Sequence, residues 1–99
     1  MGINSNIDIL KKIADMEHLR NELLSNTADF FKATTASPKL GEKSSADILC
    51  TILTTTYLLA AQLGIDYKEL DDKAIIKLRQ EVLNNEEAIE IKQLLRHLS

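Results

Sequence analysis

The chain has 99 residues, of which 44% are hydrophobic, 27% are charged and 4% are aromatic. These proportions resemble those of ordinary soluble globular domains, and no low-complexity tract indicates disorder. Three glycines, one proline and no tryptophan are too few for a turn-rich sandwich or barrel. A net charge of -3 gives no general attraction to nucleic acid or anionic lipid. We therefore expect one all-α domain over residues 1–99, with nucleic acid disfavoured as a partner.

Helical spacing of apolar residues begins in the first third of the chain, between residues 7 and 31. Ser5 followed by Asp8 resembles a capping box, and Asp15 followed by a polar turn allows a break near residues 14–16. We expect a short helix and then a longer one. Residues 34–45 are rich in Thr, Ser, Pro and Gly, so they predict a loop that joins two helices.

The most hydrophobic predicted helix covers residues 46–63, with Ser44 or Ser45 as its cap and Gly64 in a left-handed conformation at its end. This helix is apolar on nearly every face and needs neighbours on several sides. A chain of this length offers few helices to cover it. We therefore expect a homodimer or a larger oligomer.

Neither a membrane span nor an export signal is indicated. The apolar helix is at the short limit for a span, and it carries Asp47, four threonines and Gln62, which are costly in hydrocarbon. No continuous apolar stretch follows a basic one near residue 1, so we expect a cytoplasmic protein without membrane contact. Cys50, the only cysteine, lies among apolar residues and is expected to be a small buried hydrophobic residue.

Two further helices are predicted in the last third of the chain. Asp66 and Glu69 form a D-x-x-E capping box that begins a helix ending near Val82. Asn84 or Asn85 is expected to cap a last helix. The expected inner faces are Leu70, Ala74, Ile75, Leu78 and Val82 in the first helix, and Ala88, Ile91, Leu94, Leu95 and Leu98 in the second. The prediction is an all-α bundle of four or five helices, completed by homodimerisation.

Three acidic residues are the main candidates for chemistry. Glu22 and Asp29 are seven residues apart and share a helix face, with Ser25 and Asn26 between them. Asp47 lies near the expected start of the most hydrophobic helix, where an isolated buried carboxylate is costly. Two interpretations of Asp47 stay open. It is either an acid satisfied by the N–H groups of a helix N-terminus or a magnesium ligand.

Basic and aromatic residues supply candidates for nucleotide contact. Lys73 and Lys77 share a helix face and suit a phosphate, while Arg79 is rotated away from both. The alternative interpretation of these cations is an ordinary solvated helix surface. Tyr57 and Tyr67 can stack on a base, although core packing is the favoured interpretation of Tyr57.

Other site motifs are missing from the sequence. It contains no Gly-rich phosphate loop, no G-x-S-x-G and no Cys/His pairing typical of a covalent nucleophile. His18 and His97 are far apart in the chain, with no partner at the usual zinc spacing, so no zinc site is predicted.

The chain resembles the MazG-like branch of the all-α nucleoside triphosphate pyrophosphohydrolases in two segments, HLRNELLSNTADFFKA and SSADILCTILTTTYLLAAQLGID. That branch carries EExxE on one helix and EExAD on the next. Downstream, LDDKAIIKLR and QLLRHL resemble the ends of small MazG-like proteins. The resemblance covers about residues 15–98, nearly the whole chain.

The resemblance implies a magnesium site with an incomplete set of acids. The family's acidic positions fall, in chain order, on Asn21 and Glu22, Ser25, Ser44 and Asp47. In the family these groups hold Mg²⁺, which bridges the triphosphate while water attacks and releases a nucleoside monophosphate and pyrophosphate. Glu22 and Asp47 remain to hold one ion, Mg²⁺ or Mn²⁺ as its substitute. Serine and asparagine are neutral, so they neither offset a second divalent charge nor act as a strong base.

Three function hypotheses follow. The first is a Mg²⁺-dependent pyrophosphohydrolase of nucleoside triphosphates or modified nucleotides, with Glu22 and Asp47 as metal ligands and Asp29 as a supporting acid. The second is a catalytically silent MazG-like dimer that binds nucleotides or other proteins. The third is a helix-turn-helix DNA binder built around the LGID turn, which is disfavoured because acidic residues surround its cations.

Overall fold

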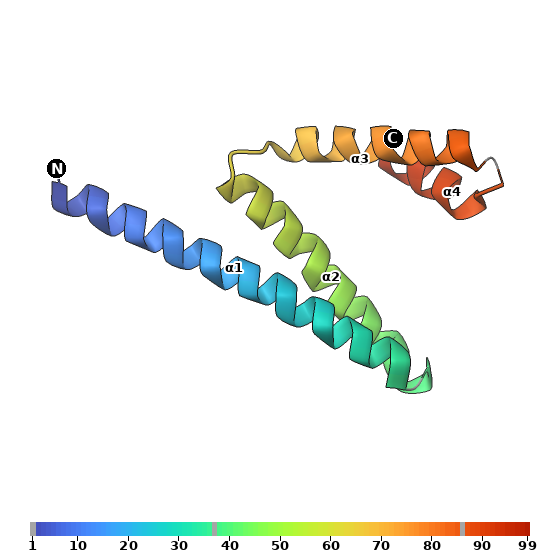
Figure 1. Cartoon of the computed structure of the whole chain (residues 1–99), viewed down its shortest axis with the longest axis horizontal. Coiled ribbons are helices and arrows are strands. Elements are labelled where there is room, and N and C mark those ends of the chain that lie inside the picture. Colours follow the sequence, from blue (N-terminus) through green and yellow to red (C-terminus); the bar gives the residue numbers. More distant parts are fainter. Residues whose placement is uncertain (1, 37, 86) are drawn as a thin grey trace. The chain divides into compact units, whose positions relative to one another are not determined.

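The computed structural model describes residues 2–36, 38–85 and 87–99, with side chains described from residue 6 onward except at 36–44 and 86. These ranges form four helices and no strand, namely α1 (Gly2–Ala36), α2 (Pro38–Gln62), α3 (Tyr67–Asn84) and α4 (Ile89–Leu98) (Figure 1). The all-α prediction is confirmed, with four helices in the described ranges. The helices form two compact units, Met1–Gly64 and Ile65–Ser99. No described helix combines the length and the apolar character needed to cross a bilayer.

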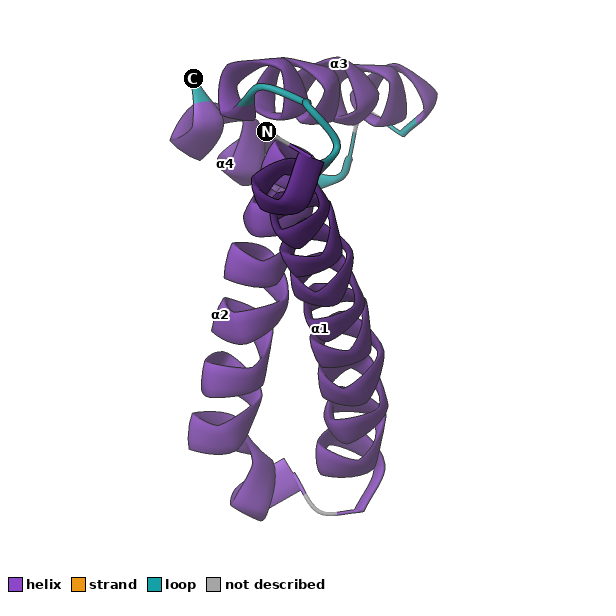
Figure 2. Cartoon of the chain, turned by 90° about the vertical axis from the view of Figure 1, so that its left-hand side faces the viewer, coloured by secondary structure: helices purple, strands orange, loops and turns teal. Residues whose placement is uncertain are grey.

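In the first unit α1 packs along α2, and Figure 2 shows the two helices side by side. Because α1 ends at Ala36 and α2 begins at Pro38, two helices that lie side by side must run antiparallel. Partly buried side chains recur at alternating intervals of three and four residues, as in a coiled coil. They include Met16, Leu19, Leu23, Asn26, Phe30 and Ala33 on α1, and Ser45, Ile48, Ile52, Leu59 and Gln62 on α2, where the fully buried Thr55 continues the same spacing.

The buried core of this hairpin is small. Among the described side chains only Thr55 and Ala60 are fully buried, with exposed fractions of 5% and 4%. A two-helix hairpin covers only one side of each helix, so the remaining apolar residues keep much of their surface open. The hydrophobicity of α2 is therefore only partly satisfied within its own unit.

The start of the chain differs from the prediction. The break expected near residues 14–16 is wrong, because α1 runs without interruption from Gly2 to Ala36. No proline or glycine interrupts that stretch, and its polar side chains reach solvent without breaking the helix. Ser5 consequently lies inside the helix rather than at its cap.

The loop expected over residues 34–45 is also wrong. The hydroxyls of Thr34 and Thr35 donate to backbone carbonyls one turn earlier, at 2.8 and 2.7 Å, so both residues are accommodated inside α1. Pro38 opens α2, a position where its missing N–H leaves no helical hydrogen bond unmade. The sequence signals for a loop therefore fall on the end of one helix and the start of the next.

The end of α2 confirms the predicted role of Gly64. This residue has φ = 76°, in the left-handed region. Its N–H donates to the carbonyl of Ala61 at 3.1 Å, and the N–H of Leu63 donates to that of Leu59 at 3.0 Å. These bonds satisfy carbonyls that the helix end would otherwise leave unpaired.

In the second unit, α3 begins directly after Asp66, as predicted, although no side-chain capping bond is formed there. The capping role predicted for Asn84 or Asn85 is wrong, because α4 begins only after Ala88. Asn85 instead ends α3, with its N–H on the carbonyls of Glu81 and Val82. Its side-chain oxygen accepts the N–H of residue 87 at 3.3 Å, which shapes the turn between the helices.

The facing sides of α3 and α4 are close to the prediction. Most of the expected inner residues are partly buried, namely Leu70, Ile75, Leu78, Val82, Ala88, Ile91, Leu95 and Leu98. Ala74 and Leu94 are exposed instead, the latter by 44%. The ten-residue α4 covers only a narrow strip of the eighteen-residue α3, so residues beside that strip stay open.

Candidate functional site

Asp47 occupies the middle of a long helix rather than its start. Because α2 begins at Pro38, neither Ser44 nor Ser45 caps it, and Asp47 lies beyond its first two turns. The interpretation of Asp47 as an acid satisfied by a helix N-terminus is therefore wrong, since free N–H groups occur only in the first turn. Its side chain is exposed, and neither of the two ion pairs among the described residues includes it. A structural partner for this carboxylate is not observed in the described chain.

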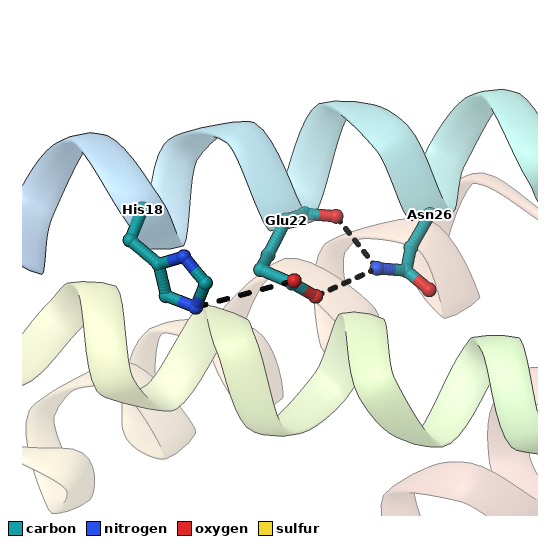
Figure 3. Close-up of polar contacts among 3 residues, drawn as sticks. All are labelled: His18, Glu22 and Asn26. Carbon is teal, nitrogen blue, oxygen red and sulfur yellow. Dashed lines mark hydrogen bonds and ion pairs between the residues drawn. The ribbon is translucent and has the colours of Figure 1, made fainter.

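Glu22 lies on α1 between two polar neighbours, each one helical turn away (Figure 3). The Asn26 side-chain amide donates to the Glu22 backbone carbonyl at 2.7 Å and to its Oε2 at 3.2 Å. On the other side, His18 Nε2 is 4.0 Å from Glu22 Oε1. The Glu22 side chain is 43% exposed, so the carboxylate is oriented by the protein and still reaches solvent.

The three candidate acids lie on one side of the hairpin. His18 of α1 and Leu58 of α2 line the same surface hollow, which fixes the side and the level at which the helices face each other. Asp29 follows His18 by three helical turns, and Asp47 precedes Leu58 by three turns. Because the helices are antiparallel, both steps lead in the same direction. Asp29 and Asp47 therefore lie at about the same level on the side of the hairpin that carries Glu22.

The acids do not converge on one point. At 1.5 Å per residue, the seven residues from Glu22 to Asp29 separate the level of Glu22 from that of Asp47 by roughly 10 Å. Among the described side chains, no three His, Cys, Asp or Glu residues gather closely enough to hold a metal ion. The structure thus places Asp29, rather than Glu22, nearest in level to Asp47. We call the surface formed by Glu22, Asp29 and Asp47 the acidic side.

The hollow that His18 lines is rich in hydrogen-bond acceptors. It is lined by Asp15, His18, Leu19, Leu58, Ala61 and Gln62. The Oε1 atom of Gln62 is buried and has no hydrogen-bond partner among the described residues. The contact of His18 with Glu22 was not predicted, because the two histidines were considered only as zinc ligands. The signal was present, since a residue four positions from a glutamate shares its helix face.

The candidate residues outside the acidic side differ in their location and exposure. Lys73, Lys77 and Arg79 are exposed residues of α3, in the second compact unit, and their predicted phosphate contact stays a prediction. Tyr67 is 49% exposed, while Tyr57 is partly buried and agrees with the packing interpretation. The expectation that Cys50 is buried is wrong, because its side chain is exposed. One neighbouring helix is not enough to cover that face of α2.

The hairpin also has an open apolar surface, which we call the outer apolar face. On α2 it is formed by Leu49 and Leu53, exposed by 48% and 57%. On α1 it is formed by Ile13, Leu24 and Phe31, exposed by 53%, 72% and 65%. Large apolar side chains gathered on one surface mark an interaction site.

A family model described as the MazG-like family matches residues 9–94 of the chain. The match covers the acidic side, the hollow and most of each unit. Comparisons with curated proteins and with solved structures gave no match.

Proposed function

The chain belongs to the MazG-like family, and we propose that it hydrolyses a nucleoside triphosphate or a modified nucleotide to the monophosphate and pyrophosphate. The observation that carries the proposal is the acidic side. Three carboxylates from two different helices lie on one side of the hairpin, and Asp47 has an exposed mid-helix position with no ion pair among the described side chains. A family match over residues 9–94 supports the same reaction class.

The donor atoms of the acidic side fit Mg²⁺ in type. Mg²⁺ prefers hard oxygen ligands and is usually bound by one or two carboxylates together with substrate phosphates and waters. Asp47 would hold the ion, with Asp29 beside it at the same level and Glu22 further along the substrate. When bound, the ion neutralises phosphate charge and polarises the phosphorus centre toward attack by water. Mn²⁺, which accepts the same ligands, is the expected substitute.

The chain's own residues prepare Glu22 for a role with water or substrate. The Asn26 amide holds Oε2, so the carboxylate points in one direction from the surface of α1. Hydrogen bonds of this kind orient a ligand or a base and restrict its rotation. Oε1 lies on the other side, toward His18, and remains open to an incoming group. Glu22 is therefore the catalytic carboxylate, and Asn26 is its positioning residue.

A second copy of the chain is the partner that we propose for the outer apolar face. Among its described side chains the hairpin buries only two completely, whereas Leu49, Leu53, Leu24 and Phe31 remain about half exposed or more. Two hairpins that join these faces form a four-helix arrangement, in which each helix gains the second neighbour that its apolar residues need. Homodimerisation then completes the core of the first unit.

A second function is favoured by one specific observation. Asn21 and Ser25 provide no charge where the family pattern has acids, and no three ligands converge among the described side chains. A chain with this site can bind a nucleotide without hydrolysing it. In that case the protein is a MazG-like dimer that acts as a nucleotide-binding or protein-interaction module.

Pyrophosphate release distinguishes the two functions. Purified protein is incubated with canonical and modified nucleoside triphosphates in the presence of Mg²⁺ or Mn²⁺, and pyrophosphate is measured. The Glu22→Gln, Asp47→Asn double variant tests the acidic side. The Glu69→Gln, Glu90→Gln double variant, which removes two exposed acids from the second unit, is its matched control.

Turnover that is lost in the first variant and kept in the control supports hydrolysis. No turnover, together with thermal stabilisation of the wild-type protein by a nucleotide, supports the binding module. Turnover that survives in the Glu22→Gln, Asp47→Asn variant contradicts the assignment of the site, and neither turnover nor stabilisation contradicts both functions.

A further inference from the structure

We propose that a second copy of the chain binds along α1 itself, with the two α1 helices antiparallel and Glu17 of each copy paired with Arg20 of the other. This inference rests on the homodimer proposed above. It adds the helix through which the copies meet, their relative direction and their register. It makes no use of the acidic side.

A stripe of exposed residues runs along α1, and we call it the α1 stripe. Its members follow one another at intervals of three or four residues, the spacing of one helix face, and are Leu10, Ile13, Glu17, Arg20, Leu24, Ala28 and Phe31. Glu17, Arg20 and Leu24 each directly follow a residue that packs against α2, so they are turned about 100° from that contact. Glu22 and Asp29 directly precede such a residue and are turned the opposite way. A partner on the α1 stripe therefore leaves the acidic side open.

The α1 stripe is symmetric in chemical character about the point midway between Glu17 and Arg20. Ile13 lies four residues before Glu17, and Leu24 lies four residues after Arg20. In a two-fold interface, a residue that contacts a second residue of the partner is matched by the reciprocal contact. Antiparallel α1 helices centred on this point place Glu17 opposite Arg20 twice and Ile13 opposite Leu24 twice. Opposite charges meet, and apolar side chains meet apolar side chains.

The same point lies at the middle of the helix. Residue 19 is midway between Gly2 and Ala36, so two α1 helices centred between Glu17 and Arg20 overlap along nearly their whole length. The stripe from Leu10 to Phe31 is about 32 Å long at 1.5 Å per residue. An interface of this length is long enough to involve six helical turns of each copy.

The first turns of α1 need cover that α2 does not supply. The 35 residues of α1 outnumber the 25 residues of α2, so an antiparallel neighbour leaves the start of α1 without a partner. Ile7, Leu10 and Ile13 are 56%, 65% and 53% exposed there. In the proposed arrangement, the second half of the other copy's α1 covers these side chains.

Glu17 and Arg20 set the direction and the register of the contact. Neither belongs to the two ion pairs among the described residues, so both charges are open to a partner. A parallel arrangement would place each charge opposite its own copy, which is unfavourable, whereas the antiparallel one pairs them. One surface hollow is lined by both charged residues and Ile13, and another by both and Leu24. The two-fold contact brings Leu24 of the second copy to the first hollow and Ile13 to the other.

Charge reversal followed by sedimentation velocity tests the pairing. Full-length protein is measured over a dilution series as wild type, as Glu17→Arg, as Arg20→Glu and as the double variant that carries both reversals. The matched control set is Asp8→Arg, Lys11→Glu and their double variant. Each control residue precedes its counterpart by nine positions, so it lies on the opposite face of the same helix with the same order and spacing of charges. Circular dichroism confirms that each variant is folded.

The expected result is a dimer whose dissociation constant rises at least about tenfold in each single reversal, because two attractive pairs become two repulsive ones. The double reversal is expected to return it to within about threefold of wild type, and the control set to leave it unchanged. Single reversals without effect on the wild-type dimer, or a double variant as weak as the singles, would overturn the pairing and leave the dimer in place. A wild-type protein that is monomeric at every concentration would overturn both. Pyrophosphate release is a separate assay, so loss of hydrolysis is not confused with either result.

Discussion

Truncation of Leu53 is the most direct test of the proposed dimer. Leu53→Ala removes three carbon atoms from the outer apolar face, worth about 2.4 kcal/mol when fully buried at roughly 0.8 kcal/mol per methylene. Leu53 is 57% exposed in the single chain, so a partner can bury at most that share. The loss is then about 1.4 kcal/mol per chain and about 2.7 kcal/mol per dimer. At about 1.4 kcal/mol per tenfold change, the dimer dissociation constant rises roughly a hundredfold.

Sedimentation velocity over a dilution series measures this change. The matched control is Leu83→Ala, the same substitution at a leucine of α3 that is 81% exposed. The control is expected to leave the dissociation constant unchanged, because Leu83 lies outside the hairpin. Alanine favours helix at least as well as leucine, so local unfolding does not imitate the effect. A dissociation constant within about threefold of wild type for Leu53→Ala, or equal weakening by the control, would refute the role of the outer apolar face.

Three further predictions concern single positions. Gly64→Ala is expected to lower the free energy of unfolding by about 1 to 2 kcal/mol. The cost comes from the backbone angle φ of 76° and not from a clash, because an added Cβ meets nothing within 4 Å. Urea unfolding followed by circular dichroism measures the free energy, and an unchanged value contradicts the backbone explanation. Asp47→Asn is expected to remove Mg²⁺ binding, measured by calorimetry, without loss of helix, because this side chain is exposed in mid-helix. The hydrogen bond and the charge of Asp72 raise the pKa of Lys68 above its usual 10.5, so the pair stabilises α3 below that pH and its contribution is lost as pH rises through the raised pKa. Asp72→Asn should return the pKa of Lys68 toward 10.5 in an NMR titration, and an unchanged pKa would contradict the pairing.

The sequence was a good guide to the helices and to the start of α3, but a poor guide to where α2 and α4 begin. Periodic apolar residues predicted the packed faces, and Gly64 was recognised because only one residue type suits a left-handed helix end. The stretch 34–45 was misjudged because threonine and serine favour caps and turns in general, yet Thr34 and Thr35 satisfy their hydroxyls inside α1. Composition does not say which of these two hydrogen-bonding patterns a threonine adopts.

The candidate site was predicted in its residues but not in its arrangement. Helical spacing placed Glu22 and Asp29 on one face, and the family resemblance added Asp47. The level at which two helices face each other depends on where one ends and the next begins, and the predicted loop over residues 34–45 was too long to define those ends. For this reason the pairing of Asp29 with Asp47, and the separation of Glu22 from both, required the structure. The interaction of His18 with Glu22 required only the four-residue spacing.

The two proposed surfaces of the hairpin are compatible because they point in different directions. On α2, Leu53 lies six residues from Asp47, which turns it about 120° around the helix axis. On α1, Leu24 lies two residues from Glu22 and is turned by about 160°. Both rotations place the apolar residues away from the contact between α1 and α2 and away from the acidic side. A second copy on the outer apolar face therefore leaves the carboxylates of the acidic side and the hollow lined by His18 open to a ligand.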